Sequence, residues 1–175
     1  MGKVLSDFNI GWPGAISRSI DDIVISLPNA GSVAIPYGVP VFLAADGEGV
    51  VLFNPDASPA QTFADFVGFT VRDASKTPST YPAGQDMSSS SGNQAGEYGV
   101  GEKVDVLVRG SIAANLTAGF LATGGKVYLK KADGTLVAEA GAEGTTFELT
   151  NVKVKTPQQN YSTIAEIVIT DRNIL

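Results

Sequence analysis

Residues 98–139, YGVGEKVDVLVRGSIAANLTAGFLATGGKVYLKKADGTLVAE, decide the fold class of this 175-residue chain. Every second residue from 104 to 108 is valine, and a period of two is typical of a strand with one buried face. Further along, residues 126–131 and 135–139 flank the short loop 132–134, which ends in glycine. This arrangement predicts a β-hairpin. The stretch therefore predicts the wall of a small β-barrel or sandwich.

The rest of the chain carries similar patterns, and no sustained helical period is present. Strands are expected within residues 33–53, 63–74, 145–155 and 163–170. Gly68 inside a strand predicts a bulge or a close backbone approach, and a second bulge is expected near residues 165–166. A short helix could form at 58–65, capped by Asp56 or Ser58, or at 117–122. We therefore predict a mainly β protein, with residues 32–175 forming a single domain.

Residues 1–31 are interpreted as an extended N-terminal arm that contains a short strand near residues 22–27. The Trp-Pro-Gly unit at 12–14 breaks any helix, and the apolar side chains around it need somewhere to be buried. They could fold back on their own domain as an ordinary first strand, or lie on another chain. The residues of this segment predicted to contact a partner are Phe8, Ile10, Trp12 and Ile16.

Residues 75–97 are interpreted as a long flexible loop inserted into the domain. Their low-complexity part reads SKTPSTYPAGQDMSSSSGNQA, and its only aromatic residue is Tyr81. Burial of so few apolar groups cannot offset the entropy cost of ordering the segment. A loop of this length is either mobile on the surface or ordered against a neighbouring subunit, so Tyr81 is a further predicted partner contact.

Composition argues against several function classes. The net charge is −6, whereas nucleic-acid binding needs clustered Lys and Arg. The chain has no cysteine and no histidine, which removes thiol chemistry, the commonest general base and the commonest metal ligand. The turn at residues 46–49 lacks the ligands of a calcium loop. We expect no enzymatic activity, no catalytic residues, no metal and no cofactor.

No targeting or membrane segment is predicted. The first residues lack the apolar core of a signal peptide, and no apolar run approaches the ~18 residues of a membrane span. The absence of cysteine suits synthesis in a reducing cytosol. Charged residues make up only 17% of the chain, below the ~25% usual for soluble domains, which also suits a surface partly covered by partners.

A series of short motifs resembles a known family. They are Pro-Tyr-Gly-Val-Pro-Val at 36–41, Phe-Val-Gly-Phe-Thr-Val at 66–71, Tyr-Gly-Val-Gly-Glu-Lys-Val-Asp-Val at 98–106, Gly-Ser-Ile-Ala-Ala at 110–114 and Gly-Lys-Val-Tyr-Leu at 125–129. With the arm before them and the long loop between the second and third, they resemble the structural cement, or decoration, proteins of tailed-bacteriophage capsids. The resemblance covers roughly residues 33–140.

The resemblance implies a non-enzymatic structural protein of the virion. Such a protein is made in the cytoplasm of the bacterial host and binds the outer surface of the capsid. Its partners are the major capsid protein, whose neighbouring subunits it bridges, and other copies of itself, with a homotrimer favoured because symmetric oligomers match capsid symmetry. Neither nucleic acid nor a membrane is expected as a partner.

Two other function classes stay open on the residues alone. A carbohydrate-binding or adhesion-type β module would need exposed aromatic side chains on one face, and the chain's tryptophan and tyrosines are dispersed in sequence. A hydrolase on a β scaffold would need two carboxylates about 5–10 Å apart in a cleft. The absence of histidine makes the hydrolase the weaker of the two.

Overall fold

The computed structural model describes residues 12–17, 21–73, 96–116, 119, 122–158 and 164–173. Over these residues the fold is almost entirely sheet, curled into an antiparallel half-barrel, so the predicted mainly β class is confirmed. The only helix in the described residues is a single 3-10 turn, Phe63–Asp65 (η1), capped by Thr62. It lies within the segment where a short helix was predicted, but Thr62 caps it rather than Asp56 or Ser58.

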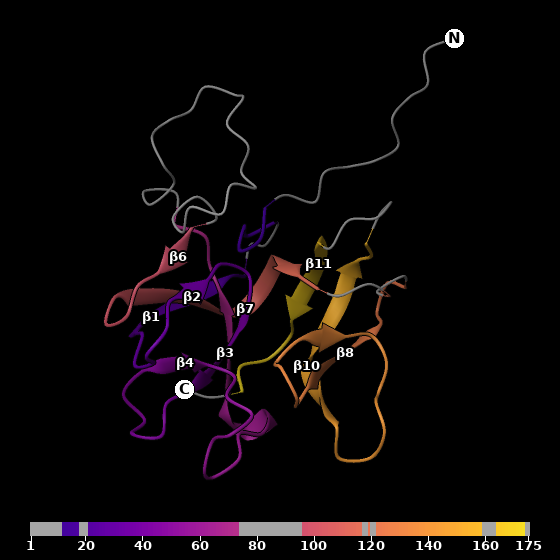
Figure 1. The fold of residues 1–175 in the computed structure, drawn as a ribbon. Coiled ribbons are helices and arrows are strands. Elements are labelled where there is room, and N and C mark those ends of the chain that lie inside the picture. Colours follow the sequence, from indigo (N-terminus) through magenta and orange to yellow (C-terminus); the bar gives the residue numbers. More distant parts are fainter. Residues whose placement is uncertain are drawn as a thin grey trace, which may run out of the picture.

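One large sheet contains most of the strands, and a two-stranded sheet lies beside it (Figure 1). The large sheet has the order β4-β3-β5-β7-β11-β10-β8-β9, with β1 also paired to β7. Its strands are β1 (Ile23–Pro28), β3 (Pro40–Leu43), β4 (Val50–Leu52), β5 (Phe66–Thr70), β7 (Lys103–Asn115), β8 (Lys126–Lys130), β9 (Leu136–Val137), β10 (Thr146–Thr156) and β11 (Ile164–Ile169). The small sheet pairs β2 (Ile35–Pro36) with β6 (Glu97–Tyr98).

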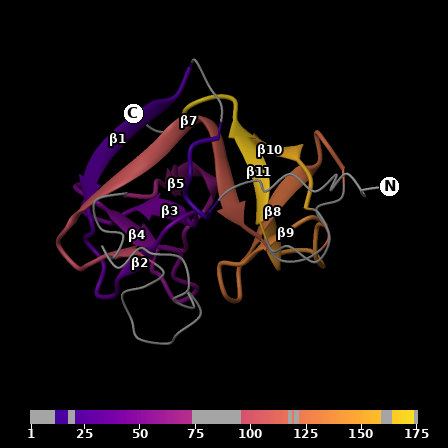
Figure 2. The same cartoon turned by 90° about the horizontal axis from the view of Figure 1, so that it is seen from above.

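The long strand β7 joins the two halves of the large sheet. Residues 103–109 of β7 pair with β1, and residues 106–107 also pair with β5, whereas residues 110–115 pair with β11. The change of partner falls at Gly110, whose φ of +121° is accessible mainly to glycine. Figures 1 and 2 show β1 to β4 on one side of β7 and β8, β10 and β11 on the other.

Two buried clusters hold the sheet halves together. The larger includes Phe42, Phe66 and Leu107 and extends over the inner faces of both halves. The smaller lies on the opposite face of the first half, beneath β1 and the small sheet, and includes the predicted alternating valines of β7. Leu107, which the alternation places on the exposed face, is fully buried as well. Both faces of β7 are therefore covered at this point.

Both predicted bulges correspond to irregular pairing. Gly68 faces Val41, and the register then slips so that Phe42 faces Phe66. A Cβ on Gly68 would overlap the carbonyl oxygen of Leu107, so the close backbone approach is also confirmed. The bulge expected near residues 165–166 lies opposite them, in β10, where the register shifts between Val154 and Thr156.

The described residues correct two predicted boundaries. Within the proposed arm, residues 1–31, the strand Ile23–Pro28 pairs with β7 and packs on the smaller cluster, so this part belongs to the sheet. The insert predicted at residues 75–97 is shorter at its C-terminal end, because Glu97 pairs with Pro36 in the small sheet. The strand near residues 22–27 was itself predicted, but its pairing with β7 is a long-range contact that local periodicity does not reveal. The two residues of β6 are too few to show a period. Residues 1–11, 18–20 and 74–95 lie outside the described residues.

Candidate interaction surface

Residues 12–17 lie against the edge of β7 that β11 leaves unpaired. The amide of Gly14 donates to the Ala113 carbonyl at 2.8 Å, Ala113 donates to Ala15 at 2.9 Å, and Ser17 donates to Ser111 at 3.0 Å. The Gly14 carbonyl also accepts from the Arg72 amide at 2.7 Å. The Trp-Pro-Gly unit is therefore a tight turn bonded to β7 and to the segment that follows β5, with Trp12 as its first residue.

Two glycines make this docking possible. Gly14 and Gly38 have φ values of +81° and +71°, in the left-handed region that other residues rarely adopt. A Cβ on Gly38 would lie 2.6 Å from the Gly14 nitrogen, and a Cβ on Gly14 would lie 2.9 Å from Cβ of Tyr37. Neither position has room for a side chain, so the two backbones pack directly on each other.

Tyr37 lies where three parts of the chain meet. Its ring is 3% exposed and meets the Tyr98 ring edge-on, with centroids 5.2 Å apart. Its hydroxyl donates to the Asp73 carbonyl at 3.4 Å, and Gly96 packs against its ring so closely that a Cβ there would overlap it. Trp12, Asp73 and Gly96, the described residues that border segments 1–11 and 74–95 in the sequence, therefore lie in one small region.

The guanidinium of Arg72 lies over two aromatic rings in this region. Its guanidinium carbon is 5.7 Å from the Trp12 ring centroid and 5.7 Å from that of Tyr37, within the range of cation–π attraction. Burial raises the pKa of Tyr37, the Asp73 carboxylate raises it further, and the Arg72 guanidinium opposes them. Trp12 itself is 51% exposed, so half of its surface faces outward.

A buried carboxylate fixes the other end of the docked segment. Glu166 is 5% exposed and accepts hydrogen bonds from Ser17 and Thr156, with the Lys155 ammonium nitrogen 3.3 Å from its Oε1. Burial opposes ionisation of Glu166, but the two hydroxyls and the ammonium outweigh it and hold its pKa below the ordinary value. Lys155 also donates to the Ser111 hydroxyl at 2.9 Å, which completes the network.

The structure places part of the predicted contact set, whose role as partner contacts stays a prediction. Trp12 and Ile16 are 51% and 39% exposed and lie on the docked segment, whereas Phe8, Ile10 and Tyr81 lie outside the described residues. Sequence reasoning missed Arg72 and Tyr37. The only signal for Arg72 is its position as the last basic residue before the low-complexity insert, and nothing in the sequence pairs it with Trp12.

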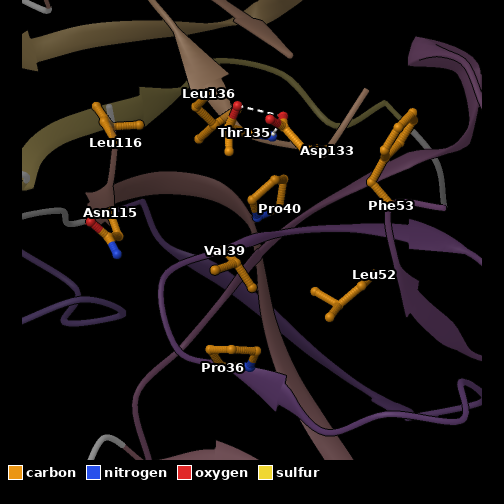
Figure 3. A pocket seen from close by; sticks show the side chains of 11 residues that line it. Pro36, Val39, Pro40, Leu52, Phe53, Asn115, Leu116, Asp133, Thr135 and Leu136 are labelled. Atoms are coloured by element: carbon orange, nitrogen blue, oxygen red, sulfur yellow. Dashed lines mark hydrogen bonds between the residues drawn. The ribbon is translucent and has the colours of Figure 1, made fainter. Parts of the chain in front are cut away.

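A cavity of about 500 Å³ lies elsewhere, between β3, the end of β7 and the β8–β9 turn (Figure 3). Its walls are mainly apolar, and its one carboxylate, Asp133, accepts from the Thr135 amide and hydroxyl at 3.0 and 2.6 Å. These bonds, with help from Lys130, hold the pKa of Asp133 below its ordinary value. The carboxylate is therefore engaged in a turn and poorly suited to proton transfer.

Searches for metal and membrane sites give no candidates in the part of the chain that the structure describes. No group of three or more acidic side chains there could hold a metal ion. No helix there is long and apolar enough to cross a membrane.

Comparison with known families decides which class the chain belongs to. The model of the family described as structural cement protein (E217 gp24/Pam3 gp6) matches residues 3–170. The chain belongs to this phage cement protein family. The resemblance expected over residues 33–140 is thus confirmed and extends over nearly the whole chain. This cement protein is a structural component of a phage capsid.

A solved structure supports the same fold. A chain from the capsid of Myoviridae phage XM1 superposes with a TM-score of 0.65, covering 95% of this cement protein and 94% of that chain. The two sequences are only 15% identical, so the likeness concerns the fold alone. No curated protein matches the chain.

Proposed function

We propose that this cement protein binds the outer surface of the phage capsid and bridges neighbouring major capsid subunits without catalysing a reaction. The observation that carries the proposal is the convergence on Tyr37. Trp12, Asp73 and Gly96, which border residues 1–11 and 74–95 in the sequence, all lie near Tyr37 at one region of the sheet. A protein whose role is mechanical needs such fixed attachment points more than a cleft.

The chemistry of the described residues supports a binding role. The hydrogen bonds around Glu166 hold Ser17, and the Arg72 guanidinium lies over the Trp12 ring. Residues 12–17 are thus held in one geometry, so little conformational entropy remains to be lost there on binding. Extended segments can add strands to a partner, because main-chain pairing supplies affinity. Many copies on one shell would add their weak contacts through multivalency.

The non-enzymatic part of the proposal rests on the family and on side-chain chemistry. The chain has no histidine and no cysteine, and the carboxylate that lines the cavity of Figure 3 is held by Thr135. The carbohydrate-binding alternative receives less support, because Trp12 is stacked on Arg72 while Tyr37 and Tyr98 are buried. A platform of neighbouring exposed rings is not found among the described residues.

We also propose that the protein acts as a homo-oligomer, with a trimer favoured, and that it is added to the shell after synthesis in the host cytoplasm. A symmetric oligomer would place identical contacts around a capsid symmetry axis. Light scattering of the purified protein during gel filtration measures the mass directly. A mass of three chains supports the trimer, and a monomer at capsid-binding concentrations contradicts it.

The binding proposal is tested by reconstitution. Shells assembled without the protein are mixed with purified protein, and electron cryomicroscopy of the washed shells locates any added density. We expect ordered density on the outer surface at the junctions between major capsid subunits. Shells that stay bare, or density within single subunits away from junctions, would contradict the proposal.

A further inference from the structure

We infer that Arg72, whose guanidinium lies over the rings of Trp12 and Tyr37, binds a carboxylate side chain of the protein partner on the capsid. The inference rests on the proposed function and deepens it by assigning the chemistry of one contact. It goes beyond the sequence predictions, which named apolar contacts alone.

The stack prepares Arg72 for this role. A guanidinium is planar, and its faces pack on aromatic rings while its N–H groups lie in its plane. With Trp12 and Tyr37 both 5.7 Å from the guanidinium carbon, the aromatic contacts fix the group, and its main-chain amide is fixed by Gly14. A guanidinium held in one orientation can bind a carboxylate through two parallel hydrogen bonds with little further loss of conformational entropy.

The guanidinium N–H groups have no acceptor of their own among the described residues. The other charged pairs there are satisfied within the chain: Arg109 lies 2.7 Å from Asp21, Lys126 lies 2.8 Å from Glu148, and Lys155 lies 3.3 Å from Glu166. Within the described ranges, the contacts of Arg72 are its two ring contacts and the bond from its amide to the Gly14 carbonyl. An arginine held rigidly beside a half-exposed tryptophan, with unused donors, is typical of an interface hot spot.

Charge complementarity favours a single carboxylate over a polyanion. Residues 1–100 contain ten acidic and four basic residues, and Arg72 is the only basic residue among those of the first hundred that the structure describes. A phosphate backbone needs several clustered cations and would be repelled by this acidic half. One carboxylate on a protein surface matches one isolated, preorganised guanidinium.

The test measures binding to bare shells by co-sedimentation over a range of protein concentrations. Arg72→Gln should raise the Kd at least tenfold, because a few hot-spot side chains supply most of the binding energy of an interface. Arg72→Lys should also weaken binding, because it keeps the charge but loses the planar fork. Lys131→Gln, which removes one charge at the exposed turn after β8, is the matched control and should bind as the unmodified protein does. Circular dichroism confirms that all variants are folded.

The outcomes separate this inference from the proposed function. If the unmodified protein binds and Arg72→Gln binds equally well, the inference is wrong while the function stands. If Arg72→Lys binds as tightly as arginine, the stacked fork is not the recognition element, and the inference is wrong as well. If the unmodified protein does not bind shells, the function and the inference fall together.

Cross-linking identifies the partner. Shells saturated with the Arg72→Lys variant are treated with a carbodiimide, which activates a carboxyl so that the lysine amine displaces the activating group and forms an amide. Mass spectrometry should find residue 72 joined to an Asp or Glu of the major capsid protein, with Arg72→Gln giving no such product. A product joined only to another copy of this chain, or none at all, would overturn the inference.

Discussion

The side chains of Ser17 and Glu166, 149 residues apart in the sequence, meet at 2.5 Å between the serine Oγ and the carboxylate Oε1. Ser17 ends the docked N-terminal segment, and Glu166 lies in β11 on the other side of β7. The contact therefore holds the C-terminal end of the docked segment, residues 12–17, to the centre of the sheet.

Replacing Glu166 by glutamine should destabilise the protein. The amide keeps the shape of the side chain, but it removes the charge facing Lys155 and replaces one acceptor by a donor facing Thr156 or Ser17. A hydrogen bond to a charged group contributes about 1.5–3 kcal/mol, and urea unfolding should show a loss of that size. Glu148→Gln is the control, because Lys126 is exposed and Lys153 is about a third exposed, and it should have a much smaller effect. Equal losses would contradict the proposed role of the network.

The same carboxylate should make stability depend on pH. The folded pKa of Glu166 lies below its ordinary value of about 4.5, so the unfolded chain binds more protons in this range, and stability rises with pH. The contribution is complete above the ordinary pKa and is lost as the pH falls through the folded pKa. The difference in unfolding free energy between unmodified and Glu166→Gln protein should therefore shrink as the pH is lowered from 6 to 3. A constant difference would contradict the assignment.

Gly68→Ala should be among the most damaging small substitutions. The added Cβ would overlap the Leu107 carbonyl and lie 2.9 Å from the Val106 side chain, forcing β5 and β7 apart in the middle of the sheet. Overpacking of this kind costs about 1–3 kcal/mol or more. Gly101→Ala is the comparison: its φ is +75° with nothing within 4 Å, so only left-handed strain of about 1 kcal/mol is expected. Urea unfolding of both variants measures the difference, and a milder effect at Gly68 would be contrary evidence.

Gly14→Ala should release the docked segment while the sheet stays folded. Its Cβ would lie 2.8 Å from the Arg72 amide and 2.9 Å from Cβ of Tyr37. Trp12 is the only tryptophan, so its emission reports this segment alone. We expect a shifted emission maximum and stronger acrylamide quenching, with unchanged far-ultraviolet circular dichroism. Gly47→Ala, at φ +75° in open space, should leave the emission unchanged. An unaltered Trp12 signal in Gly14→Ala would show that the close packing is not required.

The strands were predictable because their side chains alternate and their turns carry glycine. The valines of β7 and the hairpin β8–β9 follow directly from these patterns, as does the close approach at Gly68. The bend at Gly110 was not predictable, because it depends on a change of partner from β1 to β11. Long-range pairing of this kind leaves no local periodicity in the sequence.

The interaction surface was predictable only in part, for a similar reason. Trp12 and Ile16 were identified because apolar residues among turn formers need a partner. Arg72 and Glu166 were not, because their roles depend on Tyr37 and Ser17, which lie 35 and 149 residues away in the chain. The net charge of −6 describes the whole chain and gives no indication that a single arginine is functional.

The position of the docked segment decides which truncation tests the proposed arm. Removing residues 1–11 leaves Gly14, Ala15 and Ser17 bonded to β7, so this variant should unfold in urea like the full chain and bind capsid shells more weakly.

Removing residues 1–20 also exposes the β7 edge, breaks the Ser17–Glu166 contact and removes the Trp12 ring from Arg72. It should lose about 1.5–3 kcal/mol for the hydrogen bond to the charged carboxylate alone and bind more weakly still. Equal stability of the two truncations would show that residues 12–17 contribute nothing to the folded domain. Full capsid binding by the shorter truncation would place the contacts of the N-terminal region within residues 12–17.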